Sequence, residues 1–297
     1  DELWKYDGVN APSMVADIRA GSIGSSPSGL TVFNNELYFS ASDGNYGWEL
    51  WKYDGTNAPS MVADIYPGSY NSYPLGLTVF NNELYFKAND GTYGWELWKY
   101  DGTNAPIMVA DINPGSGESD LAYLTVFNNE LYFSAKDGTN GYELWKYDGT
   151  NAPIMVADIN LGSGDSDPAY LTVFNNQLYF RAEDGTHGTE LWKYDGTNAP
   201  SMVADINSGS SSSFPEDLTV FNNELYFRAY DATHGIELWK YDGTNAPSMV
   251  ADIRAGSSSS SPDDLTVFNN ELYFEADDAT NGYELWKYSQ QTTITYA

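Results

Sequence analysis

Asp43 and Glu49 enclose a short loop that holds two glycines, and such a loop occurs at six places along the chain, with alanine in place of the first glycine in the last two. Carboxylate oxygens around tight glycine turns are ligands that Ca²⁺ favours. Calcium is the only cofactor that the sequence suggests, and its candidate ligands are Asp43, Asp90, Asp137, Asp184, Asp231 and Asp278. In the alternative interpretation each aspartate only caps its own turn.

The same loops differ from copy to copy at two positions. The first position holds Tyr46, Tyr93, Asn140, His187, His234 and Asn281, and the second, two residues later, holds Trp48, Trp95, Tyr142, Thr189, Ile236 and Tyr283. Aromatic faces beside carboxylates and amides suit carbohydrate, because sugar C–H groups stack on rings while hydroxyls take the polar groups. The predicted ligand-binding residues are Tyr46, Trp48, Tyr93, Trp95, Tyr142, His187, His234 and Tyr283. The alternative is that these are surface loops that drift without selection.

Residues for catalysis are scarce. The chain has two histidines and no cysteine, and it contains no Gly-x-Ser-x-Gly elbow, no HExxH motif and no phosphate-binding glycine loop before a helix. Carboxylate pairs are plentiful, but a catalytic acid–base pair needs two different environments that separate the two pKa values. Nearly identical repeats provide nearly identical environments. The sequence predicts a protein that is not an enzyme, and a hydrolase is the least supported alternative.

A repeat positions these loops. The segment Glu-Leu-Trp-Lys-Tyr occurs seven times, and its tryptophans follow one another at intervals of 47 residues, from Trp4 to Trp286. One period contains four segments of strand-forming residues separated by turn residues, at 30–33, 36–41, 48–53 and 60–65. Asn34-Asn35 is expected to form a tight hairpin turn. Each period therefore predicts a four-stranded antiparallel meander.

Four strands in a period of this length are typical of a β-propeller blade. The innermost strand occurs six times, so we predict an all-β, six-bladed propeller that forms a single domain over residues 1–297, with a tail at 289–297. The N-terminal strand at 13–18 can complete the blade that begins at Leu265 and so close the ring. One of the two terminal third strands, 2–6 or 284–288, is then surplus, and the β-prone tail at 292–296 is a further candidate for a sheet edge.

The charge restricts the partners. Thirteen Lys and Arg against 42 Asp and Glu give a net charge of −29. This charge argues against nucleic acid and anionic lipid, and no apolar run is long enough for membrane insertion. The chain begins at Asp1 without a leader pattern, so we expect a processed segment or part of a longer protein.

The repeated Glu49-Leu50-Trp51-Lys52-Tyr53-Asp54-Gly55-Thr56 resembles the ELWxxDGT repeat family of bacterial proteins, with small departures at Val9 and at residues 289–291. This resemblance implies a propeller and a secreted or cell-surface location, and it implies no catalytic residues.

The two variable loops of each repeat should open on one face and the two constant turns on the other, because loops alternate between the ends of a meander. We therefore predict a non-catalytic extracellular binding or scaffold module that presents its variable face to a glycan or a protein. The alternative is a purely structural adhesion or surface-assembly repeat with no small ligand.

Overall fold

The computed structural model describes residues 1–289, and these residues form antiparallel sheets without any helix. None of the described segments could span a membrane as a helix. The sheets belong to two compact units, Asp1–Val156 and Ala157–Ala297, which are described separately. The all-β prediction is confirmed, the single domain stays a prediction, and the predicted tail strand at 292–296 lies outside the described residues.

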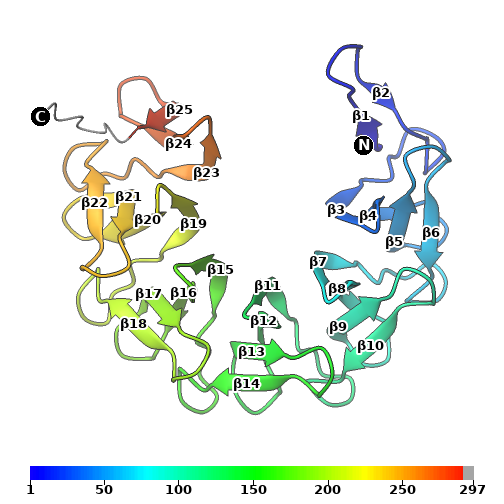
Figure 1. The fold of residues 1–297 in the computed structure, drawn as a ribbon, viewed down its shortest axis with the longest axis horizontal. Coiled ribbons are helices and arrows are strands. Elements are labelled where there is room, and N and C mark those ends of the chain that lie inside the picture. Colours follow the sequence, from blue (N-terminus) through cyan, green and yellow to red (C-terminus); the bar gives the residue numbers. More distant parts are fainter. Residues whose placement is uncertain (290–297) are drawn as a thin grey trace, which may run out of the picture. The chain divides into compact units, whose positions relative to one another are not determined.

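The first unit contains one small sheet and the four-stranded sheets of three repeats (Figure 1). The small sheet pairs β1 (Trp4–Lys5) with β2 (Ser13–Met14). The larger sheets consist of β3 (Ser28–Phe33), β4 (Glu36–Ser42), β5 (Trp48–Tyr53) and β6 (Ser60–Ala63); of β7 (Leu75–Phe80), β8 (Glu83–Asn89), β9 (Trp95–Tyr100) and β10 (Ile107–Ala110); and of β11 (Ala122–Phe127), β12 (Glu130–Ala135), β13 (Glu143–Tyr147) and β14 (Ile154–Ala157).

The second unit continues the same pattern (Figure 1). Its sheets consist of β15 (Ala169–Phe174), β16 (Gln177–Glu183), β17 (Thr189–Tyr194) and β18 (Ser201–Ala204); of β19 (Glu216–Phe221), β20 (Glu224–Asp231), β21 (Gly235–Tyr241) and β22 (Ser248–Ala251); and of β23 (Asp263–Phe268), β24 (Glu271–Asp277) and β25 (Tyr283–Tyr288).

Turn chemistry fixes the register within each sheet. Asn34 and Asn35 have φ angles of 47° and 63°, as a hairpin turn with two left-handed residues requires, so the predicted turn is confirmed. The register then places Phe39 opposite Trp51 and Leu37 opposite Tyr53. The strand β5 has its predicted bounds, whereas β6 ends at Ala63, two residues earlier than predicted.

Each core lies between two neighbouring sheets, because the strands carry apolar side chains on both faces. Tyr38 and Leu50 of one sheet pack with Leu84 and Phe86 of the next. In the second unit, Tyr179 and Leu191 pack in the same way against the sheet β19–β22. Burying one such side chain stabilises the fold by about 1.5–3 kcal/mol, so each sheet depends on its neighbour.

The N-terminal residues have the positions of a third and a fourth strand beside the sheet β3–β6. Leu3 packs with Phe39 and Trp51, and the amide of Val15 donates to the carbonyl of Leu3 at 2.8 Å. At the other end of the described chain, the sheet β23–β25 has three strands, and Leu285 of β25 is 76% exposed. The equivalent Leu50 and Leu191 are fully buried, so β25 lacks the cover that the other third strands have.

Candidate functional site

A buried glutamate at the start of the third strand fixes the loop that follows the fourth strand. Glu49 is fully buried, and its Oε2 accepts hydrogen bonds from the Ile65 amide at 2.8 Å and from Ser72 Oγ at 2.6 Å. Its Oε1 accepts from the Ser72 amide at 3.1 Å. We call this arrangement the glutamate–serine bridge. It explains the early end of β6, since the chain turns from the sheet to the carboxylate.

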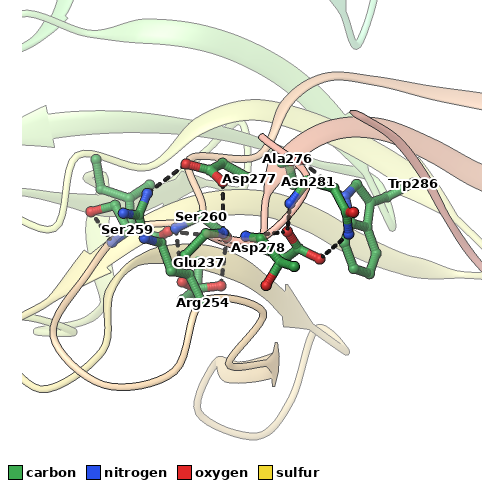
Figure 2. Close-up of polar contacts among 12 residues, drawn as sticks. Glu237, Arg254, Ser259, Ser260, Ala276, Asp277, Asp278, Asn281 and Trp286 are labelled. Atoms are coloured by element: carbon green, nitrogen blue, oxygen red, sulfur yellow. Dashed lines mark hydrogen bonds and ion pairs between the residues drawn. The ribbon is translucent and has the colours of Figure 1, made fainter. Parts of the chain in front are cut away.

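The glutamate–serine bridge recurs through both units. Figure 2 shows it at Glu237, which accepts from the amide and the hydroxyl of Ser260 at 3.0 and 2.6 Å. Glu2 forms the same contacts with Ser25, so the N-terminal copy of the third strand also carries it. The glutamate was expected to be one of the carboxylates around a calcium loop, whereas the serine had no predicted role although it recurs at constant spacing.

The residue directly after the bridge serine is held in a left-handed conformation. Tyr73 has a φ of 42°, and its amide donates to the carbonyl of Trp48 at 3.0 Å. We call this the pre-strand position. Its φ lies between 42° and 47° in all six copies, which are Ser26, Tyr73, Asp120, Asp167, Phe214 and Ser261. This position was not predicted, although the sequence shows a variable residue after a constant serine at each copy.

In the first unit the pre-strand position builds a stack of three aromatic rings. The ring of Tyr73 lies between the indoles of Trp48 and Trp95, with centroid separations of 5.4 and 6.1 Å and interplanar angles of 22°. We call these three residues the aromatic row. The tryptophans begin β5 and β9 and are half-buried. Their stacking on Tyr73 explains this, because the ring of Tyr73 already covers one face of each indole.

Charged side chains extend the aromatic row along the unit. Lys87 Nζ lies 4.9 Å from the centroid of the Trp95 ring and 2.7 Å from the carboxylate of Asp120. Tyr142 donates a hydrogen bond to the other oxygen of Asp120 at 2.9 Å, and Lys136 lies 4.7 Å from the Tyr142 ring. Tyr142 is therefore linked to Trp95 through Asp120 and Lys87.

The remaining predicted aromatic residues lie apart from this row. Tyr46 and Tyr93 are 43% and 39% exposed in the loops before β5 and β9, and neither stacks on the neighbouring tryptophan in a ring contact of the structure. Tyr283 is exposed at the start of β25. A second ring pair, Tyr66 and Tyr70, has centroids 4.8 Å apart.

The two histidines are held by the aspartates of their own loops. His187 Nδ1 lies 2.8 Å from Asp184 Oδ2, and His234 has the same contact with Asp231. Hydrogen bonding to these carboxylates raises the pKa of both imidazoles. No serine bonds to either imidazole within residues 1–289.

The predicted calcium ligands cap their own turns. Asp43 Oδ1 accepts from the amides of Asn45 and Tyr46 at 2.8 and 3.0 Å. Asp278 does the same with Thr280 and Asn281, and these hydrogen bonds lower its pKa (Figure 2). The part of the chain described by the structure has no group of three or more His, Cys, Asp or Glu placed to hold a metal. Turn capping accounts for these six residues, and calcium stays a prediction.

In the second unit, charged residues on β16, β19, β20 and β23 lie close to one another. Glu216 accepts from both Arg181 and Arg228, and Arg228 also lies 3.6 Å from Asp263. Arg181 is 5.1 Å from the ring of Tyr170. Burial, followed by the nearby Asp263, raises the pKa of Asp217 to about 6. These arginines are therefore neutralised by carboxylates within the same unit.

A constant turn lies against the constant turn of the neighbouring repeat, and the two variable loops of one repeat lie against each other. A Cβ on Gly102, in a constant turn, would lie 3.0 Å from the side chain of Asn34 in the neighbouring constant turn. A Cβ on Gly47, in a variable loop, would lie 1.8 Å from the carbonyl oxygen of Tyr70 in the other variable loop.

Comparison with known proteins identifies the fold. Neither a protein-family model nor a curated protein matches the sequence, so the ELWxxDGT resemblance stays a prediction. A puromycin hydrolase structure aligns with 89% of this chain at 12% identity and a TM-score of 0.57, and the alignment covers 45% of the hydrolase. The β-propeller domain of the Trilobed protease from Pyrococcus furiosus aligns with 96% of this chain and 90% of its own at 10% identity and a TM-score of 0.53. The BP39L lectin from Burkholderia pseudomallei aligns with 90% of this chain and 81% of its own at 11% identity and a TM-score of 0.51.

These structures show that the chain has a propeller-like fold, and this chain spans less than half of the puromycin hydrolase. They also correct the predicted function. The prediction of a non-catalytic extracellular binding or scaffold module is wrong, because the similar propellers belong to a hydrolase and a protease as well as to a lectin.

The buried glutamates predict a falling stability as the pH rises. Burial raises the pKa of Glu49 and Glu96 from 4.5 to about 7, against the opposing hydrogen bonds. Between these two values the unfolded carboxyl is ionised while the folded one keeps its proton. Each such group should lower the free energy of unfolding by up to about 1.4 kcal/mol per pH unit in this window.

Chemical denaturation of Glu49→Gln across the window from pH 4.5 to pH 7 measures this effect. The free energy of unfolding of this variant should fall less steeply with rising pH than that of the protein without the substitution. Asp54→Asn is the control, because hydrogen bonds from Asn57 and Thr56 lower the pKa of Asp54 from 3.8, below the window. Equal slopes for Glu49→Gln and the unchanged protein would contradict the assignment.

Proposed function

We propose that this chain serves a peptide hydrolase as its propeller. In this role the chain binds the substrate peptide on the face formed by its variable loops. Residues outside this chain cleave the peptide bond. The pairing of a propeller with a hydrolase is taken from the peptidases of similar fold, which is an analogy of architecture. The chemistry of the peptide comes from this chain itself.

The observation that carries the proposal is the excess of carboxylates. The net charge is −29, and Lys87, Arg181 and Arg228 are each already paired with a carboxylate. Hydrogen bonds from the backbone of their own loops lower the pKa values of Asp137 and Asp278, so these variable-loop carboxylates stay ionised at neutral pH. A face of this kind attracts cations, so the proposed substrates are peptides rich in Lys and Arg.

The architecture that we propose is a six-bladed ring closed by the N-terminal strand. Support comes from the two terminal sheets. The sheet β1–β2 has a third and a fourth strand without inner strands, and β23–β25 has the inner strands without a fourth. Leu285 on β25 is exposed where the equivalent leucines of other sheets are buried. Adding β2 to the last sheet would supply its missing fourth strand and remove an open sheet edge.

Peptide binding tests the function. Short peptides of equal length, one rich in Lys and one rich in Glu, are compared by calorimetry at low and high salt. The Lys-rich peptide should bind with an affinity that falls as the salt concentration rises, whereas the Glu-rich peptide should not bind. Mass spectrometry should find both peptides intact, because cleavage is assigned outside this chain.

A matched pair of variants locates the binding face. Asp90→Asn, Asp137→Asn and Asp184→Asn together remove three charges from variable loops while keeping a turn-capping oxygen. The control removes three charges from constant turns through Asp54→Asn, Asp101→Asn and Asp148→Asn, which cap turns in the same way. Only the first triple variant should weaken binding. Equal binding of the two peptides, or equal loss in both triple variants, would overturn the proposal.

Hydrogen exchange tests the closure. The outer amides of β25 have no partner strand within the sheet β23–β25, so without closure they should exchange rapidly. In a ring closed by β2 they should exchange slowly in the intact chain. Deleting residues 1–18 should then accelerate exchange in β23–β25 as well as in the adjacent β3–β6. Acceleration confined to β3–β6 would show that the N-terminal residues do not close the ring.

A further inference from the structure

The second unit contains a cavity of about 450 Å³ beside the pre-strand residue Phe214. Its wall includes Phe214, Tyr230, Ile236 and Arg228. Phe214 is 52% exposed although it is a large apolar residue held in a left-handed conformation. Pockets of about 300–1,000 Å³ with apolar walls and a few polar groups are typical of small-molecule sites.

This cavity occupies the place that the aromatic row fills in the first unit. Three repeats of 47 residues relate Tyr73 to Phe214, and they relate Trp48 and Trp95 to Thr189 and Ile236. The two indoles that enclose Tyr73 therefore have much smaller counterparts around Phe214. Ile236, the smaller counterpart of Trp95, lines the open space next to Phe214.

The backbone is the same at the two places. The amide of Phe214 donates to the carbonyl of Thr189 at 3.2 Å, as the amide of Tyr73 does to that of Trp48 at 3.0 Å. The φ angles of Phe214 and Tyr73 are 47° and 42°. Glu190 anchors Ser213 by the glutamate–serine bridge, just as Glu49 anchors Ser72. The difference between a filled and an open place thus lies in the side chains alone.

Both places also have a cationic side chain at the equivalent position. Arg228 is the counterpart of Lys87, whose ammonium group lies 4.9 Å from the centroid of the Trp95 ring. Arg228 lines the cavity and is held in place by Glu216. A ring that took the place of Trp95 would therefore meet Phe214 on one side and lie within reach of the guanidinium. Electron-rich rings gain most from such a cation.

We propose that the cavity at Phe214 binds an indole or phenol side chain of the peptide that the variable face receives. The peptide context rests on the proposed function, whereas the recognition of the ring rests on the comparison of the two units. Arg228 is already neutralised by Glu216, with Asp263 3.6 Å away, so the cavity favours an uncharged ring over an anionic one. The ring stacks on Phe214 as the tryptophans stack on Tyr73.

Binding of an aromatic ring in the cavity is tested with N-acetyl-5-fluorotryptophanamide, an uncharged probe observed by fluorine NMR. Titration of the intact chain should give saturable line broadening, and N-acetylalaninamide should not compete. Ile236→Trp introduces an indole at the position equivalent to Trp95. This variant should weaken probe binding by about tenfold or more, while the melting temperature stays unchanged or rises. Phe214→Ala removes the stacking partner and should weaken binding to a similar extent.

The reciprocal variant is made in the first unit. Trp95→Ile removes one indole from the aromatic row and should create a second site for the probe beside Tyr73, so the bound stoichiometry should rise. Absence of probe binding by the intact chain would overturn the proposal, and so would unchanged affinity in both Ile236→Trp and Phe214→Ala. If one of these two variants fails to fold, the other and the Trp95→Ile gain still decide the outcome.

Two Lys-rich peptides, one with a single Trp and one with Ala in its place, separate this inference from the proposed function. Tighter binding of the Trp peptide, abolished by Ile236→Trp, supports both. Equal binding of both peptides without binding of the fluorinated probe leaves the function standing and removes the aromatic site. Binding of the probe without binding of either peptide keeps the aromatic site and removes the peptide function.

Discussion

The glutamate–serine bridge is the interaction on which the loop face depends. Each bridge buries a carboxyl group, which is costly unless its oxygens are hydrogen-bonded, and Glu49 meets this requirement with the amide of Ile65 and two donors from Ser72. These three bonds draw the loop away from β6 and fix the residue after the serine at a positive φ. Without the bridge, Tyr73 and Phe214 would have no defined position relative to the third strands, and neither the aromatic row nor the cavity would form.

A constant backbone with a few variable side chains therefore decides what each part of the face can do. The pre-strand residue and the first residue of the third strand come from segments that are 25 residues apart, yet the bridge brings Tyr73 onto Trp48. Where large rings occupy these positions, the protein fills its own site. Where Thr189 and Ile236 replace them, the same backbone leaves an open cavity of about 450 Å³. Near-identical repeats can thus differ in binding without any change of fold.

The sequence predicted much of the fold because its signals are local. Strand-forming segments and turn residues located the four strands of a repeat, including the bounds of β5. The site was harder to predict, because Tyr73 contacts Trp95 only through a left-handed bend that no propensity indicates for a bulky residue. The functional class was predicted wrongly, since a propeller supports many functions and the fold alone does not choose among them.

Packing explains why only one face varies. On the constant face a Cβ on Gly102 would approach the Asn34 side chain to 3.0 Å, and both Asn34 and Asn35 are left-handed, so each turn restricts the next. On the other face the fixed elements are the bridge glutamate, the bridge serine and a glycine such as Gly47, whose added Cβ would collide with the Tyr70 backbone. The variable residues between these fixed points include Trp48, Tyr73 and Trp95, and Tyr73 stacks on both tryptophans. These side chains can therefore change together. An aromatic ring can be replaced by another ring or by a smaller side chain that leaves a cavity, while the sheets stay the same.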